Sequence, residues 1–164
     1  MRKMPDVEFD VVTAAFAKDA RTAPSPVPNA TVHRVGFGHP IDKLLLPLLG
    51  FRAALALHRK HRYLFAWSVM ASYAALAGIL VKRAARLPVL ITLADQRLAG
   101  LSPLSRAFFG IALRDADQVY GMDVAQEAHA AGIARRALSR ASIGDGDAFV
   151  NQLRYAYADI LRAS

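Results

Sequence analysis

The polar residues best placed for chemistry follow the clearest predicted strand of the chain. Residues 88–93 (Pro-Val-Leu-Ile-Thr-Leu) are apolar or β-branched, which predicts a buried strand beginning at Pro88. In open α/β sheets, ligands bind outside the carboxyl ends of the strands. The polar residues expected there, as candidates for ligand contact, are Thr92, Asp95, Gln96 and Arg97. We take Asp95 as the candidate catalytic residue, because a carboxylate there can accept a proton or hold a sugar hydroxyl. A loop that caps the next helix explains these residues equally well.

A second group of candidate ligand-binding residues follows the last predicted strand, residues 137–143. If that strand lies in the same sheet, the residues after it reach the same edge as Asp95. The group consists of Gly144, Asp145, Gly146 and Asp147. Gly and Asp are also common turn residues, so an ordinary turn remains the alternative.

Three other patterns are weaker signals. His58 and His61 lie three residues apart on a predicted helix, but a metal needs a third ligand and two cations stand between them, so no metal site is expected. Asp115 and Asp117 could act as paired carboxylates, although Asp between a helix and a strand is typical of a turn. Gly36-Phe37-Gly38 is too short to indicate phosphate binding and favours a turn.

These residues would be positioned by strands that alternate with helices. Strands are predicted at residues 7–13, 31–36, 63–67, 88–93, 118–120 and 137–143, and helices at 41–61, 69–86, 102–114, 123–132 and 148–162. A Pro-rich loop occupies residues 21–30. This alternation predicts an α/β fold with right-handed crossovers, a three-layer Rossmann-like parallel sheet with helices on both faces.

Composition limits the class of protein. The 164 residues, at roughly 100–200 per domain, predict a single domain over residues 1–164. The chain is 54% hydrophobic and has no Cys, which excludes a mostly disordered chain, a disulfide scaffold and a Cys-based metal centre. Asp6, Glu8 and Asp10 stand where a signal peptide would be apolar, so a cytoplasmic location is expected.

The formal net charge of +8 admits three kinds of partner: nucleic acid, an anionic membrane surface or a phosphorylated substrate. Basic clusters stand at the ends of apolar segments, where they also complement helix dipoles. Aromatic and basic residues do not interleave as in single-strand binders, so we do not expect nucleic acid as a partner.

Two segments raise the question of a membrane. Residues 64–81 contain no charged residue, which is compatible with a membrane span, but Ala, Ser and Trp67 within them favour a buried strand followed by a helix. Residues 41–62 are amphipathic and could lie on an anionic membrane surface with Leu45, Leu48 and Leu49 in the lipid, although a helix packed on a sheet is the simpler interpretation.

Taken in order, five segments resemble the N-terminal domain of glycosyltransferase family 4-type enzymes of the GT-B fold. The strand with Thr92 resembles the family's R-x-P-hydrophobic-x-T pattern. The segments are residues 63–67 running into an Ala-rich helix, 86–93 (Arg-Leu-Pro-Val-Leu-Ile-Thr-Leu), 114–119 (Arg-Asp-Ala-Asp-Gln-Val), 127–132 (Glu to Gly) and 143–149 (Ile-Gly-Asp-Gly-Asp-Ala-Phe). The similarity covers about residues 7–149.

The resemblance implies one half of a GT-B fold, the acceptor-side domain of a retaining transferase. Such an enzyme moves a sugar from a nucleotide-sugar substrate to an acceptor, in some members a lipid-linked one at the cytoplasmic face of the membrane, and needs no further cofactor. The family's donor-binding C-terminal domain is not part of this sequence, so we expect a donor-binding domain or a partner chain to supply it. The sequence departs from the family at Ala94, where His is common, and at Asp145, where Asn is common. The alternative function is a non-catalytic, membrane-surface-associated basic binding module.

Overall fold

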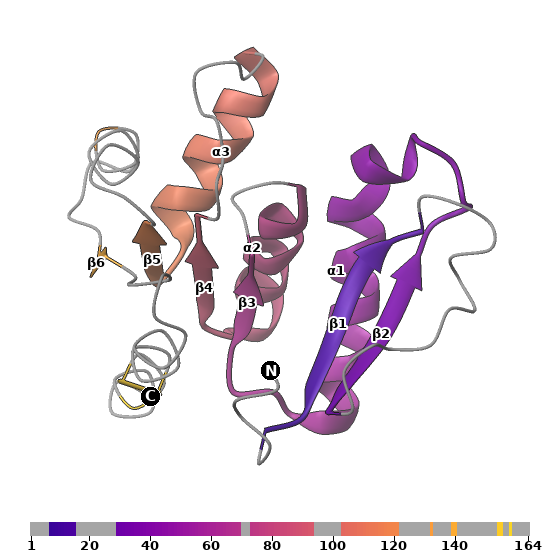
Figure 1. Ribbon diagram of the computed structural model, residues 1–164, viewed down its shortest axis with the longest axis horizontal. Helices are drawn as coiled ribbons and strands as arrows, with labels where there is room; N and C mark the ends of the chain where they lie inside the picture. The colour runs from indigo at the N-terminus through magenta and orange to yellow at the C-terminus, as the bar shows by residue number, and fades with distance from the viewer. Residues whose placement is uncertain are drawn as a thin grey trace.

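The computed structural model describes residues 7–15, 29–69, 73–93 and 103–121, together with residues 132, 139–140, 154–155 and 158. Strands and helices alternate along most of this chain (Figure 1). The elements in chain order are β1 (Phe9–Ala14), β2 (Ala30–Val35), α1 (Asp42–His61), β3 (Ala66–Ser68), α2 (Tyr73–Ala85), β4 (Val89–Thr92), α3 (Pro103–Asp115), β5 (Gln118–Gly121) and β6 (Ser139–Arg140).

All the strand pairs described are parallel, which confirms the predicted α/β class with a Rossmann-like arrangement. The strands β3, β4, β5 and β6 are neighbours in that order, as expected for successive crossovers of one hand. The described strands divide into two parallel sheets, because β1 and β2 pair with each other and form a sheet of their own. No described strand lies between β1 and β3 to pair with both.

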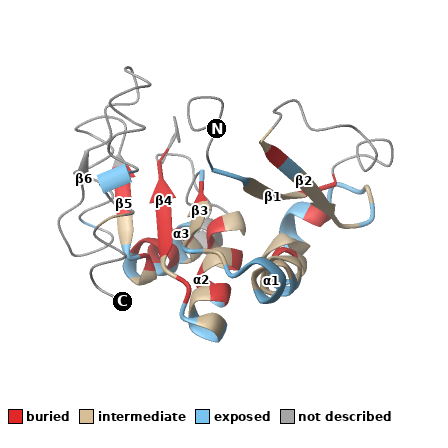
Figure 2. Cartoon of the chain, turned by 90° about the horizontal axis from the view of Figure 1, so that it is seen from below, coloured by how far each residue is buried: buried red, intermediate tan, exposed pale blue. Residues whose placement is uncertain are grey.

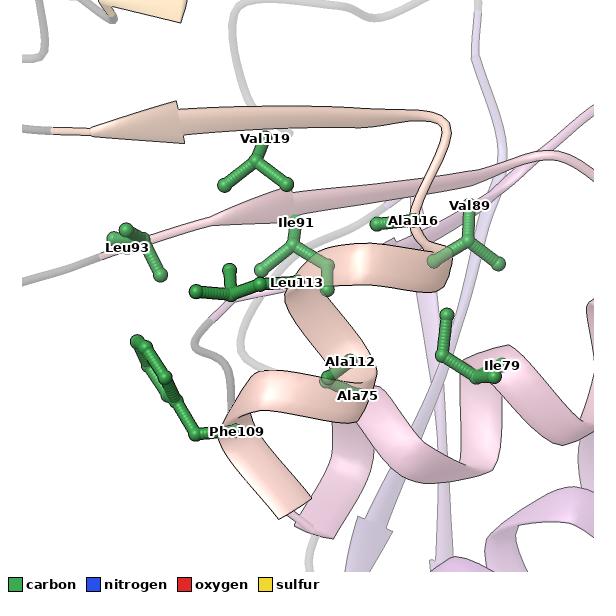
Figure 3. Close-up of a cluster of buried hydrophobic side chains, with 10 residues drawn as sticks. All are labelled: Ala75, Ile79, Val89, Ile91, Leu93, Phe109, Ala112, Leu113, Ala116 and Val119. Carbon is green, nitrogen blue, oxygen red and sulfur yellow. The ribbon is translucent and has the colours of Figure 1, made fainter. Parts of the chain in front are cut away.

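The main core lies between the sheet β3–β6 and the helices α2 and α3 (Figure 3). Val89 and Ile91 of β4 and Leu93, just after it, are every second residue, so their side chains lie on one face. There they pack with Ile79 of α2 and Phe109 of α3. Each of these five side chains is at most 2% exposed. The helices α1, α2 and α3 all lie on this one side of the strands in Figure 2.

The opposite face of the central strand is also covered. Leu90 and Thr92 point away from the core helices, and they are 1% and 2% exposed. All four residues of β4 are therefore buried, as a strand covered on both faces requires.

The helix α1 joins the two sheets. It packs against β1, β2 and α2. The close approach to α2 occurs at Gly50, where an added Cβ would lie 3.3 Å from Ala77 Cβ. The helix passes unbroken through Pro47 and ends at Arg62, whose left-handed backbone lets its amide donate to the His58 carbonyl at 2.8 Å.

The uncharged residues 64–81 form the strand β3 and most of the helix α2, so the strand–helix interpretation is confirmed where the segment is described. Within the described ranges, no helix has the length and apolar character needed to cross a bilayer.

Several predicted elements lie mostly outside the described residues. They are the Pro-rich loop at 21–30, of which residues 29 and 30 are described, the helices at 123–132 and 148–162, and the outer parts of the strand at 137–143.

Candidate functional site

The carboxyl ends of β3, β4 and β5 meet at one edge of the sheet, because the three strands are parallel neighbours. Thr92 is the last residue of β4, and the amide of the next residue, Leu93, donates to the Tyr120 carbonyl of β5 at 2.8 Å. This edge is where a parallel α/β sheet binds its ligands.

The hydroxyl of Thr92 is engaged within the protein. The indole Nε1 of Trp67, on the neighbouring strand β3, donates to Thr92 Oγ1 at 2.8 Å. Since Thr92 is only 2% exposed, this geometry gives it a positioning role at the strand end. Direct contact between Thr92 and a substrate stays a prediction.

The remaining candidates lie outside the described residues. These are Asp95, Gln96, Arg97, Gly144, Asp145, Gly146 and Asp147. Their roles stay predictions, and the described part of the site is the strand edge formed by Trp67, Thr92 and Tyr120.

Sequence reasoning missed a polar cluster between the two sheets. The carboxylate of Asp10 on β1 lies 2.5 Å from His33 Nε2 on β2, and its other oxygen accepts a hydrogen bond from the hydroxyl of Tyr63. The rings of His58 and His61 lie 6.2 and 5.9 Å from the Tyr63 ring. The cluster thus connects β1 and β2 to the end of α1 and the segment before β3.

The cluster shifts the pKa values of two of its side chains, Asp10 and Tyr63. Partial burial alone raises the pKa of the Asp10 carboxyl, but the hydrogen bonds from Tyr63 and His33, aided by the His33 and His61 imidazoles, outweigh it and hold the pKa below its ordinary value of 3.8. Burial and the adjacent carboxylate raise the pKa of the Tyr63 hydroxyl above its ordinary value of 10.0. Both shifts favour the charged Asp10 beside the neutral Tyr63, which suits an anchoring contact. The cluster sits toward the amino ends of the strands, away from the edge with Thr92, because Tyr63 precedes β3.

The pair His58 and His61 has no metal-binding geometry in the described ranges. There, no group of three or more His, Asp or Glu side chains is arranged to hold a metal ion. The two imidazoles instead flank Tyr63.

The glycine-containing turn at residues 36–38 encloses a carboxylate of its own chain. The amides of Phe37, Gly38 and His39 donate to Asp42 Oδ2 at 2.8, 2.7 and 3.1 Å. Asp42 is 1% exposed and opens α1. These three amides therefore serve the start of the helix, in agreement with the turn that the sequence favours.

The carboxylates of Asp115 and Asp117 each pair with the end of α2. Arg83 pairs with Asp115, and Lys82 Nζ lies 2.6 Å from Asp117 Oδ1. The second oxygen of Asp117 accepts the amide of Val89 at 2.7 Å. These contacts attach the start of β4 to the turn before β5, as expected for structural turn residues.

Comparison with known proteins gives no assignment. No protein-family model matches the chain, and no curated protein matches it at the required significance.

Proposed function

We propose that this chain is the acceptor-side domain of a glycosyltransferase that uses a nucleotide sugar. The observation that supports the proposal best is the order of parallel strands β3, β4, β5 and β6. Three of the five segments that resemble the family, residues 63–67, 86–93 and 114–119, overlap β3, β4 and β5, and the carboxyl ends of these three strands share one edge. Segments that lay on strands of different sheets would not have supported the proposal.

In the proposed reaction, the acceptor binds at the strand edge beyond Thr92. Asp95, three residues further along the chain, accepts the proton of the attacking hydroxyl or holds a sugar hydroxyl. We expect residues 144–147 to contribute to substrate binding as well. A donor-binding domain or partner chain holds the nucleotide sugar. The bond between the sugar and the diphosphate breaks, the acceptor oxygen bonds to the same carbon of the sugar, and the nucleoside diphosphate leaves.

The experiment uses the native enzyme that contains this chain. Replacing Asp95 by Asn removes the ionisable group and keeps the shape, so turnover should fall about 100-fold or more while the melting temperature stays near that of the wild type. Asp117→Asn is the matched control for loss of one carboxylate; it should lower stability by breaking the contacts to Lys82 and Val89, with less effect on turnover of the folded enzyme. Unchanged turnover of Asp95→Asn would remove Asp95 from the site.

A second candidate function is a non-catalytic module at the cytoplasmic face of an anionic membrane. The distribution of charge favours it. Residues 43–93 contain eight basic residues (Lys or Arg) and no acidic residue (Asp or Glu), whereas the rest of the chain contains 13 basic and 13 acidic residues. The whole net charge of +8 thus belongs to residues 43–93, which form α1 after its first residue, β3, α2 and β4. Nucleotide-sugar turnover by the native protein separates the two candidates, because a purely binding module has none.

A further inference from the structure

The helices α1, α2 and α3 leave an open apolar groove of about 490 Å³ between them. Three of its apolar side chains, one from each helix, are well exposed: Leu44 is 50% exposed, Leu80 38% and Ile111 39%. The groove is lined by Leu44, Pro47, Tyr73, Leu76, Ile79, Leu80, Arg83, Phe108 and Ile111. Exposed apolar side chains that gather on neighbouring helices in this way offer a surface on which a partner with an apolar surface can pack.

The helix α1 extends this surface with a row of exposed side chains that changes from apolar to positively charged along the helix. Leu44, Leu48 and Arg52 follow one another at four-residue spacing, so they lie on one side of the helix. Leu48 is 59% exposed, and Arg52 is also exposed. The sequence suggested Leu45, Leu48 and Leu49 for contact with lipid. In the structure Leu45 and Leu49 are half-buried, and the exposed leucines of this helix are Leu44 and Leu48.

Residues 43–93, which form α1 after its first residue, β3, α2 and β4, carry charge of one sign. Two of the eight cations in residues 43–93, Lys82 and Arg83, pair with Asp117 and Asp115. The other six make no ion pair in the part of the chain that the structure describes; they are Lys43, Arg52, Arg59, Lys60, Arg62 and Arg86. All six are exposed. An apolar groove on elements whose exposed, unpaired charges are positive complements a surface that offers both hydrocarbon and negative charge.

We infer that an anionic lipid bilayer docks on the helical face made by α1, α2 and α3. In this arrangement Leu44, Leu48 and the groove take acyl chains, and the cations meet the headgroup phosphates. Removal of the leucines from water favours docking. The attraction between each Lys or Arg and the anionic surface adds to it. Nucleic acid would use the cations and leave the apolar groove in water.

The orientation of the helices relates this face to the proposed site. A helix that follows a parallel strand begins at the carboxyl edge of the sheet, and Leu44 and Tyr73 lie in the first turns of α1 and α2. One end of the groove, at Tyr73, therefore lies toward the edge that carries Thr92, and the groove extends from there to Arg83 in the last turn of α2. If the proposed transfer function holds, on which this last step rests, docking brings that edge to the membrane, where a lipid-linked acceptor presents its head group.

The test is vesicle binding by the full 164-residue chain, which requires no donor sugar. The chain is sedimented with vesicles of phosphatidylcholine alone and with vesicles that also contain phosphatidylglycerol. We expect binding to the anionic vesicles only, falling several-fold as salt is raised. The double variant Leu44→Gln/Leu48→Gln should lose about tenfold or more in affinity, because two inserted leucines are removed.

Leu64→Gln is the matched control, since Leu64 is 52% exposed but lies in the segment before β3, away from the groove. It should bind like the wild type. The inference is overturned if the wild-type chain stays in the supernatant, if Leu64→Gln loses as much affinity as the double variant, or if the chain binds a single-stranded oligonucleotide and no vesicles. Vesicle binding without sugar transfer would keep this inference and reject the transferase, and the reverse result would do the opposite.

Discussion

The indole of Trp67 donates a hydrogen bond to the hydroxyl of Thr92 across two neighbouring parallel strands, at 2.8 Å. This contact fixes the ends of β3 and β4 relative to each other at the edge where ligands of α/β sheets bind. A residue that the sequence suggests for substrate contact thus orients a neighbouring aromatic side chain of the same edge.

Replacing Thr92 by Val removes the acceptor and keeps the shape of the side chain. The free energy of unfolding should fall by about 1–2 kcal/mol, since a buried hydrogen bond is lost. Trp67 is the only tryptophan of the chain, so its fluorescence reports the change directly, with emission moving to shorter wavelength. Thr92→Ser keeps the hydroxyl, so its emission should stay close to that of the wild type, while the loss of a buried methyl group lowers its free energy of unfolding by about 1 kcal/mol. Equal emission maxima for the Val and Ser variants would contradict the role given to this bond.

The contact between Tyr63 and Asp10 should affect stability in acid. The pKa of Asp10 is lower in the folded chain than in the unfolded chain, so its contribution to stability is present above pH 3.8 and disappears as the pH falls through the lower folded value. Tyr63→Phe removes one hydrogen bond to the carboxylate, which should raise the folded pKa of Asp10 toward 3.8 and lower stability at pH 7 by about 1–2 kcal/mol.

The measurement is the ¹³C chemical shift of the Asp10 carboxyl followed from neutral to acid pH, together with urea unfolding at each pH. Tyr155→Phe is the control, because Tyr155 is 73% exposed. An Asp10 pKa that does not move in Tyr63→Phe would show that Tyr63 leaves the carboxylate unaffected.

The turn before α1 should tolerate no side chain at Gly36. Its φ of +119° is strained for other residues, and an added Cβ would lie 2.4 Å from Asp42 Cγ. Gly36→Ala should therefore cost roughly 2–4 kcal/mol of the free energy of unfolding, by strain and by displacing the carboxylate that three amides share.

The matched control is Gly132→Ala, where an added Cβ meets nothing within 4 Å and the residue is helical. This variant should be neutral or gain up to about 1 kcal/mol from helix propensity. Thermal or urea unfolding of both variants checks the pair, and equal stabilities would contradict the close approach of Gly36 to Asp42.

Local patterns in the sequence were sufficient to predict most of the elements. The leucine spacing predicts a helix at 41–61, and the structure has a helix at Asp42–His61. The prediction succeeds because apolar residues at three- and four-residue spacing form one face of a helix. The strand β3 is displaced from the predicted 63–67 to Ala66–Ser68. Tyr63 is held by Asp10 outside the strand, and an apolar run alone does not set register.

The polar contacts between elements could not be predicted in the same way. Asp10 meets a side chain 23 residues away and another 53 residues away, and only the pairing of β1 with β2 and the path of α1 bring them together. The groove likewise combines Leu44, Leu80 and Ile111 from three helices, each of which looks like an ordinary apolar position in the sequence. Such sites arise from packing, which periodicity does not encode.

The central claim is that this chain serves sugar transfer, and a turnover assay tests it most directly. The native gene product, purified from the cells that make it, is offered one nucleotide sugar at a time with a membrane lipid extract as acceptor, and release of nucleoside diphosphate is measured. We predict release with at least one donor, dependent on the acceptor and about 100-fold lower in Asp95→Asn. A folded native product that releases no nucleoside diphosphate with any donor would contradict the claim.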